Sequence, residues 1–200
     1  MLGRAGYLAP NLASTSPANG MIGNHYELTT LWRVHGSLEE VSEVLGDALS
    51  LPRWWPTVYL RAELIRSGEP TDHEGGVIAL RTRGWLPYTL CWRLRLLENN
   101  APHGFAFDAD GDFVGRGVWI FSADGDYVNI RFDWRVSAEK PLLFWFSWIL
   151  RPIFVLNHRW AMARGEESLK LELARRRTSL ASNNRSGDEH DSEAQGIEAE

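Results

Sequence analysis

The sequence predicts an α+β domain in which an antiparallel sheet of seven strands packs against one long C-terminal helix. Segments in which apolar and polar residues alternate, as they do in strands, fill most of the chain between residues 26 and 137. Two short helical segments interrupt them directly after the first strand. The long helical pattern follows the last strand, from about Pro141 to Arg177. This order favours an antiparallel meander over alternating β and α units.

The first strand is predicted in YELTTLWRVHG, residues 26–36, because its side chains alternate between two faces. One face carries Leu28, Thr30, Trp32 and Val34. Arg33 and His35 lie on the other face, so this strand is expected to have one side on a core and one side in water.

Two short helices are predicted next. In SLEEVSEVLGDAL, Ser37 and Glu40 have the spacing of a capping box, and Gly46 is expected to end the helix. A second helical turn is predicted around SLPRWWP, where Pro56 stops it.

Six further strands follow, separated by turn-forming segments such as ENNAPHG and ADGD. They are predicted at residues 57–67, 76–83, 88–98, 103–109, 113–122 and 127–137.

The last element is predicted to be a helix. Glu166 and Lys170 stand at i,i+4 spacing, and the basic run that ends at Arg177 suits the negative end of a helix dipole. Pro152 is expected to kink or split this helix.

The charges predict where the domain ends. Between Asn24 and Arg177 there are 20 acidic residues and 19 Lys or Arg, whereas residues 178–200 hold six acidic residues and one Arg. We predict a disordered leader at 1–23, a domain at 24–177 and a disordered acidic tail at 178–200. The nearly neutral domain lacks the basic face that nucleic-acid binding needs, so no nucleic-acid partner is expected.

The N-terminal segment predicts no signal peptide, because it lacks the apolar run that such a peptide needs, and both Met1 and Met21 are candidate translation starts. Cys91 is the only cysteine, which excludes an internal disulfide. Together these features predict a cytoplasmic protein.

Several strings resemble those of a known superfamily when they are taken in order. They are SLEEVSEVLGDALSLPRWWPTV, GDFVGRGVWIF, YVNIRFDWRV and LLFWFSWILRPIFVLNHRWAMARGEESLK. Over about residues 25–175, the chain is similar to the helix-grip fold of the START/SRPBCC superfamily, and in particular to its bacterial polyketide cyclase/dehydrase-like members. The resemblance implies a curved sheet that grips the long C-terminal helix, with a hydrophobic cavity between them. It does not imply one activity, because carriers and enzymes share this fold.

His158 is the titratable group on the helix face that is expected to meet the sheet. A helical wheel gathers this face from Phe154, His158, Ala161, Met162, Gly165, Leu169 and Leu173. The small Ala161 and Gly165 are expected to leave space beneath the helix. His158 has two open interpretations, a hydrogen-bonding group for a ligand or a core histidine with a protein partner.

Strand alternation predicts which side chains line the expected cavity. It places Trp92 on the inward face of one strand, and Phe132 and Trp134 on the inward face of another. The ligand-binding residues that we predict are Trp32, Trp92, Trp134, Phe132, His158, Met162, Leu169 and Arg81. Among these, His158 and Arg81 are expected to orient a polar end of the ligand.

No metal or cofactor site is predicted. The six histidines show no paired ligand spacing, and the DADGD segment lacks the Gly and Glu of a calcium loop, since Phe113 and Trp119 stand there. GRGVWI is no dinucleotide-binding loop either, because no helix is expected to follow it.

The apolar stretch LLFWFSWIL, residues 142–150, is expected to be covered by something apolar. A buried cap over the cavity, a homodimer contact and a peripheral membrane contact all remain open.

The sequence therefore favours a carrier or sensor of a hydrophobic small molecule, such as a lipid, an isoprenoid or a polyketide. The first alternative is a polyketide cyclase/dehydratase-like enzyme that uses His158 as its catalytic acid/base. The second is a membrane-peripheral interaction protein that docks through residues 142–150.

Overall fold

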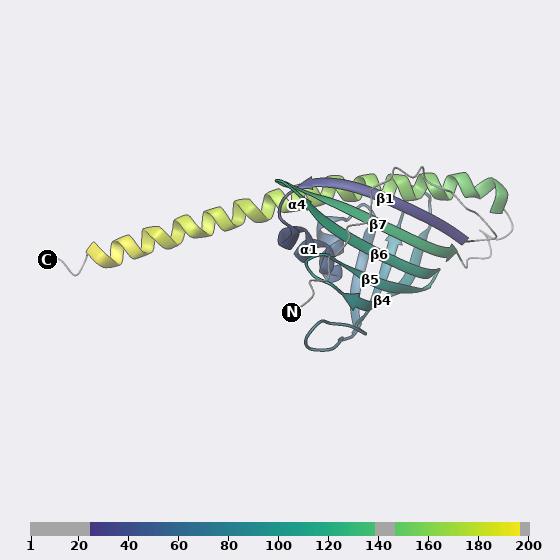
Figure 1. The fold of residues 1–200 in the computed structure, drawn as a ribbon, viewed down its shortest axis with the longest axis horizontal. Helices are drawn as coiled ribbons and strands as arrows, with labels where there is room; N and C mark the ends of the chain where they lie inside the picture. The colour runs from purple at the N-terminus through teal and green to yellow at the C-terminus, as the bar shows by residue number, and fades with distance from the viewer. Residues whose placement is uncertain (1–24, 139–146, 197–200) are drawn as a thin grey trace, which may run out of the picture.

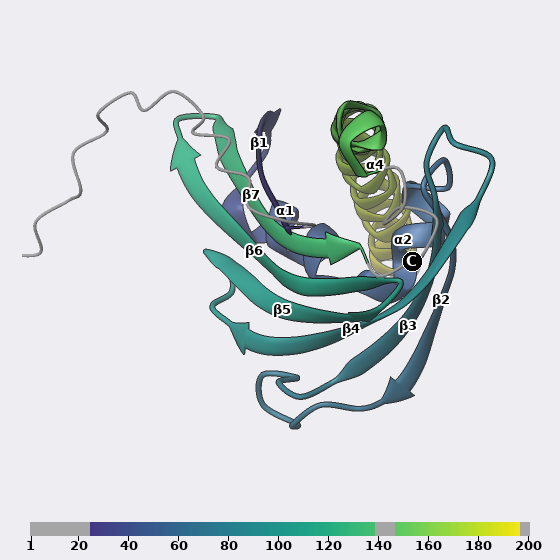
Figure 2. The same cartoon turned by 90° about the vertical axis from the view of Figure 1, so that its right-hand side faces the viewer.

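A curved antiparallel sheet of seven strands forms the body of the chain, and helix α4 lies along its concave side (Figures 1 and 2). The computed structural model describes the backbone of residues 25–138 and 147–196, and the side chains of residues 26–137 and 152–182. The strands are β1 (His25–His35), β2 (Tyr59–Arg66), β3 (Val77–Arg83), β4 (Thr89–Asn99), β5 (Gly104–Gly111), β6 (Phe113–Asp124) and β7 (Tyr127–Ala138). The helices are α1 (Leu38–Gly46), the 3-10 turn η1 (Ala48–Ser50), α2 (Leu51–Trp54) and α4 (Ser147–Gly196).

The sheet has the strand order β1-β7-β6-β5-β4-β3-β2, and every neighbouring pair is antiparallel. Strand β1 pairs with the last strand, whereas β2 lies at the opposite edge. Each predicted strand matches an observed one within two residues at either end. The predicted fold class, a curved seven-stranded sheet with two short helices after the first strand and a long C-terminal helix, is confirmed.

The alternation predicted for the strands is also observed. On β7 the inward side chains are all buried, and they are Val128, Ile130, Phe132, Trp134 and Val136. The outward residues are mostly polar or charged, and several of them pair across the strands, as Arg95 of β4 does with Asp108 of β5 at 3.0 Å. One face of the sheet therefore meets the core while the other meets water.

Helix α1 begins with the capping box that the sequence predicts. The Ser37 hydroxyl accepts from the Glu40 backbone N–H at 3.2 Å, and the Glu40 carboxylate accepts from the Ser37 N–H at 2.9 Å. The same carboxylate accepts two bonds of 2.7 Å from the Arg177 guanidinium of α4. Glu40 therefore caps one helix and ties it to another, and the Arg177 bonds lower the pKa of Glu40 to about 2.

Helix α4 is longer and more continuous than the sequence predicts. Pro152 is its sixth residue, and it neither splits the helix nor prevents it from continuing to Gly196. The end expected near Arg177 is not observed, because no proline follows Pro152 and the next glycine after Gly165 is Gly187. The tail expected from residue 178 onward thus begins as part of this helix. The leader at 1–23 lies outside the described residues.

The face of α4 predicted to meet the sheet does so. Phe154, Met162, Leu169 and Leu173 are all buried. The space expected beneath Gly165 is filled, however, because a Cβ built on Gly165 would overlap the indole ring of Trp55. Gly165 is therefore needed for close packing of α4 on Trp55, and it borders no empty space.

Beyond Gly165, a buried carboxylate anchors α4 to α2. Glu172 is 4% exposed and accepts two bonds from Arg53 of α2, at 2.8 and 2.9 Å. It also accepts bonds from Arg175 and Arg176 of its own helix. Those of Arg175 contribute most to a pKa of Glu172 well below the usual range.

Candidate functional site

A cavity of about 1030 Å³ lies between the concave face of the sheet and α4. Its wall is mainly aromatic and aliphatic. The large apolar side chains on it include Trp55, Leu90, Trp92, Leu94, Phe105, Phe107, Phe113, Trp119, Phe132, Trp134, Phe154 and Met162. Exposed lining residues such as Leu49, Leu64 and His73 show that the cavity reaches the surface at the end formed by η1 and the β2–β3 segment.

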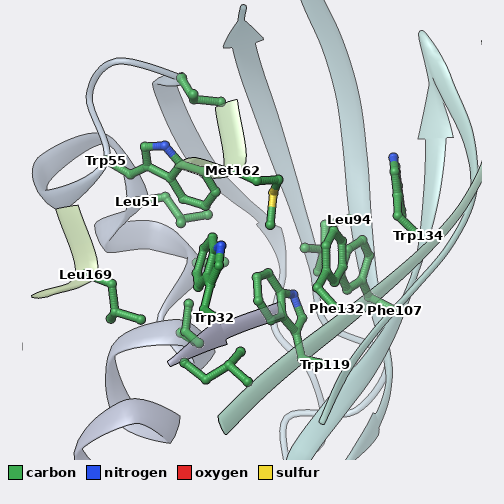
Figure 3. Close-up of a cluster of buried hydrophobic side chains, with 14 of the residues drawn as sticks. Trp32, Leu51, Trp55, Leu94, Phe107, Trp119, Phe132, Trp134, Met162 and Leu169 are labelled. Carbon is green, nitrogen blue, oxygen red and sulfur yellow. The ribbon is translucent and has the colours of Figure 1, made fainter. Parts of the chain in front are cut away.

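A row of nearly parallel rings covers the sheet side of the cavity (Figure 3). Trp119 and Phe132 stack at 4.2 Å with their planes 18° apart. Phe132 and Trp134 follow at 5.9 Å and 22°, and Phe107 is within 17° of the plane of Phe132. A wall of packed aromatic rings suits the burial of apolar ligand surface.

The strand register explains how these rings fit. Trp119 of β6 stands opposite Phe132 of β7, and Gly117 stands between Phe107 of β5 and Trp134 of β7. A Cβ built on Gly117 would overlap the Phe107 ring. The missing side chain at Gly117 therefore permits the close approach of a protein ring.

His158 lines the cavity from α4, and its Nε2 lies 3.2 Å from the hydroxyl oxygen of Thr30 on β1. Burial lowers the pKa of His158 to about 4, and the neighbouring Arg159 contributes in the same direction. The imidazole is therefore neutral at pH 7. Its partner is a protein group, the hydroxyl of a residue on β1.

Two hydroxyl groups that sequence reasoning missed also line the cavity, those of Tyr59 on β2 and Thr82 on β3. They stand opposite each other in the β2–β3 register. Thr82 is 5% exposed, and its oxygen accepts a bond of 3.2 Å from Nε1 of Trp92. The alternation of Leu80, Arg81 and Thr82 indicates that Thr82 points inward. The apolar pattern of β2 is too short to fix the register of β2 against β3, so the pairing of the two residues could not be predicted.

Five of the predicted ligand-binding residues line the cavity together, and they are Trp92, Phe132, Trp134, His158 and Met162. The other three do not. Arg81 alternates with the buried Leu80 and Thr82, so its side chain points to the outer face of the sheet and is exposed.

Trp32 and Leu169 belong to the packed core beside the cavity. Trp32 is 4% exposed and lies between the rings of Trp55, at 5.8 Å, and Trp119, at 5.4 Å. Leu169 is fully buried on the part of α4 beyond Gly165, where Trp55 fills the space under the helix. Met162 is the last residue of α4 that borders the cavity.

Among the described side chains, residues 26–137 and 152–182, no three from His, Cys, Asp or Glu are placed to hold a metal ion. In the same part of the chain, no helix has both the length and the apolar character needed to cross a membrane. The alternatives for residues 142–150 concern side chains outside the described ones, so they stay predictions.

No protein-family model matches this sequence, and no curated protein matches it either. Solved structures do match its fold. The Zhui aromatase/cyclase from Streptomyces sp. R1128 has a TM-score of 0.60 at 16% identity, covering 76% of this chain and 95% of its own. A START superfamily protein from Mycobacterium smegmatis has a TM-score of 0.59 at 11% identity, with 74% and 97% covered. A conserved protein from Geobacillus kaustophilus has a TM-score of 0.56 at 12% identity, with 74% and 95% covered.

These similarities cover about three quarters of this chain. At such low identity they concern the fold, and the activity of each matched protein stays its own. With its curved sheet, the two short helices after β1 and the long helix on the concave side, this chain has the fold of the START/SRPBCC superfamily.

Proposed function

We propose that this protein binds a hydrophobic small molecule in the cavity between the sheet and α4, as a carrier or a sensor. The observation that carries the proposal is a cavity of about 1030 Å³ with a mainly aromatic and aliphatic wall. Ligand pockets in proteins have volumes of about 300–1000 Å³. Burial of apolar ligand surface contributes roughly 25 cal/mol per Å² before ordering costs, which makes this wall a suitable binding surface.

The charges of the wall restrict the ligand class. Arg83 is the only Lys or Arg among the described lining residues, and its side chain is exposed. An anionic head group buried in the cavity would lack a counter-charge and would be costly to desolvate. A largely uncharged lipid, isoprenoid or polyketide-like molecule therefore fits best. A cytoplasmic location is part of this proposal.

A cavity-filling variant tests the proposal directly. Ala161 lines the cavity, whereas Ala163, two residues away on α4, is exposed. We expect Ala161→Phe to weaken binding of the neutral dye Nile red at least several-fold, and Ala163→Phe to leave it unchanged. A fluorescence titration measures both. Equal affinities in the two variants would place the dye outside the cavity.

Native mass spectrometry of protein purified from its own host tests whether a ligand is carried. A lipid-like mass that is released when the protein unfolds supports a carrier. If no such mass is found and no apolar dye competes for the cavity, the proposed function is wrong.

A cyclase/dehydratase-like enzyme is the second candidate. His158 favours it, because a neutral imidazole borders the cavity while the Thr30 hydroxyl holds one of its ring nitrogens. A base with a pKa of about 4 is weak at neutral pH, which argues for the carrier. Turnover of a poly-β-ketone model compound that His158→Gln abolishes, with binding of the compound retained, would favour the enzyme.

A further inference from the structure

We infer that Tyr59 and Thr82 form a hydrogen-bonding subsite inside the cavity, which takes one uncharged carbonyl oxygen of an otherwise apolar ligand. This inference rests on the proposed function and adds the chemical class of the group that is recognised. Two side-chain hydroxyl groups on the apolar cavity wall each have a proton to donate.

The first proton belongs to Tyr59. Its hydroxyl forms no hydrogen bond with the described part of the chain, and its ring meets that of Trp55 edge-on at 5.1 Å. Among the described side chains, the nitrogen and oxygen atoms that are fully enclosed and lack a hydrogen-bond partner are Nε1 of Trp54 and Nε1 of Trp55. The Tyr59 oxygen is not one of them, so it is not sealed off. It therefore borders open space, and the space that Tyr59 lines is the cavity.

The second proton belongs to Thr82. The Thr82 oxygen accepts from Nε1 of Trp92 at 3.2 Å, and the hydroxyl still has its proton to donate. No acceptor for the Thr82 hydroxyl proton is found among the described residues. A buried donor without an acceptor is unfavourable, so a hydroxyl held in this way favours a ligand with an acceptor group.

The two side chains are neighbours across the strands. Tyr59 and Thr82 are directly opposite in the antiparallel β2–β3 pair, so they share one face of the sheet. Such cross-strand pairs have Cβ atoms about 4.5–5.5 Å apart. One carbonyl oxygen has two lone pairs, which allows it to accept from both hydroxyls at once.

The surroundings select a neutral acceptor. Burial raises the pKa of Tyr59 well above its usual value, so the phenol stays a donor throughout the physiological range. A carboxylate would need a nearby cation, and the one Lys or Arg among the described lining residues is the exposed Arg83. A ketone, ester or amide carbonyl needs none.

A matched pair of rigid probes tests the subsite. Fluorene and 9-fluorenone have nearly the same shape, and 9-fluorenone adds one carbonyl oxygen. Quenching of the protein's tryptophan fluorescence measures the affinity of each. We expect Tyr59→Phe to weaken 9-fluorenone binding about two- to tenfold, the equivalent of one net hydrogen bond, and to leave fluorene binding unchanged. Thr82→Ser keeps the hydroxyl and should keep the preference, and Tyr127→Phe, at an exposed tyrosine, is the matched control.

The carbonyl stretching band of bound 9-fluorenone gives a second readout that a merely structural role would not move. In the wild-type protein we expect this band at lower frequency than in cyclohexane, and in Tyr59→Phe we expect part of that shift to disappear. If both probes bind and Tyr59→Phe changes neither their ratio nor the band, the subsite is wrong and the apolar cavity remains. If neither probe nor Nile red binds, the proposed function fails and the subsite fails with it.

Discussion

The indole ring of Trp55 occupies the space that a side chain at Gly165 would need. A Cβ on Gly165 would overlap the six-membered part of the ring, and Trp55 is 2% exposed. On one side of this contact α4 borders the cavity as far as Met162, and on the other it packs into a solid core through Leu169.

Gly165→Ala should therefore destabilise the protein although alanine is the better helix former. The helix gains about 1 kcal/mol from the exchange, while overpacking of a filled core typically costs about 1–3 kcal/mol. We expect a net loss of about 1 kcal/mol in urea unfolding. Adding Trp55→Leu should reverse the sign of the Gly165→Ala effect, and the same sign in both backgrounds would contradict the contact.

Gly117→Ala should reduce the cavity. The added methyl group meets the Phe107 ring, which already packs against Trp134 at 5.6 Å and Phe132 at 6.3 Å. The ring can therefore yield only toward the cavity. We expect Nile red to bind several-fold more weakly, whereas Val118→Ala, on the outward side of the same strand, should bind like the wild type.

Glu172→Gln should cost about 2 kcal/mol of unfolding free energy. The buried carboxylate accepts from three guanidinium groups, and loss of its charge leaves them with a neutral acceptor. The arginines keep contact with water, which holds the loss below that of a fully buried pair. Glu167→Gln, in an exposed pair with Arg164, should change stability by less than about 0.5 kcal/mol. If both variants lost the same unfolding free energy, Glu172 would not anchor α4 to α2.

His158 should make the protein less stable as the pH falls from about 6.5 to about 4. Its folded-state pKa of about 4 lies below the usual 6.5, so in this window the unfolded chain takes up a proton that the folded chain does not. The loss reaches up to about 3 kcal/mol, and the contribution is fully present above pH 6.5.

The free energy of unfolding in urea is measured as a function of pH for the wild type and for His158→Gln. The difference between the two profiles separates the effect of His158 from that of the titrating carboxylates. Glu40 loses its contribution at lower pH, as its pKa of about 2 is approached. The exposed His103→Gln variant should follow the wild type throughout. A wild-type profile that matches His158→Gln between pH 4 and 6.5 would contradict a buried neutral imidazole.

The strands and the inward faces of β4 and β7 could be predicted because strand alternation reports which side is buried. Trp92, Phe132 and Trp134 were placed on the cavity wall by this argument alone. The apolar face of α4 followed in the same way from helical spacing, which brought His158 and Met162 to the cavity.

The limits of the cavity could not be predicted, because they depend on contacts between distant segments. Alternation shows that Trp32 is buried, but the rings of Trp55 and Trp119 that enclose it come from other elements. Small residues at positions 161 and 165 suggested space in both places, and Trp55 fills one of them. The pairing of Tyr59 with Thr82 depends on a β2–β3 register that has irregularities on both sides, so the hydroxyl pair was missed.

The ion pairs of Glu172 with Arg53 and of Arg177 with Glu40 both join α4 on the C-terminal side of Gly165. The rings that face the hollow interior are on the other side. The side chains that line the cavity can therefore change in evolution, and the preferred ligand with them, while the ion pairs that fasten α4 to α1 and α2 stay the same. A protein divided in this manner is a favourable starting point for redesigned recognition, since the aromatic side chains that line the cavity take no part in the ion pairs that secure α4.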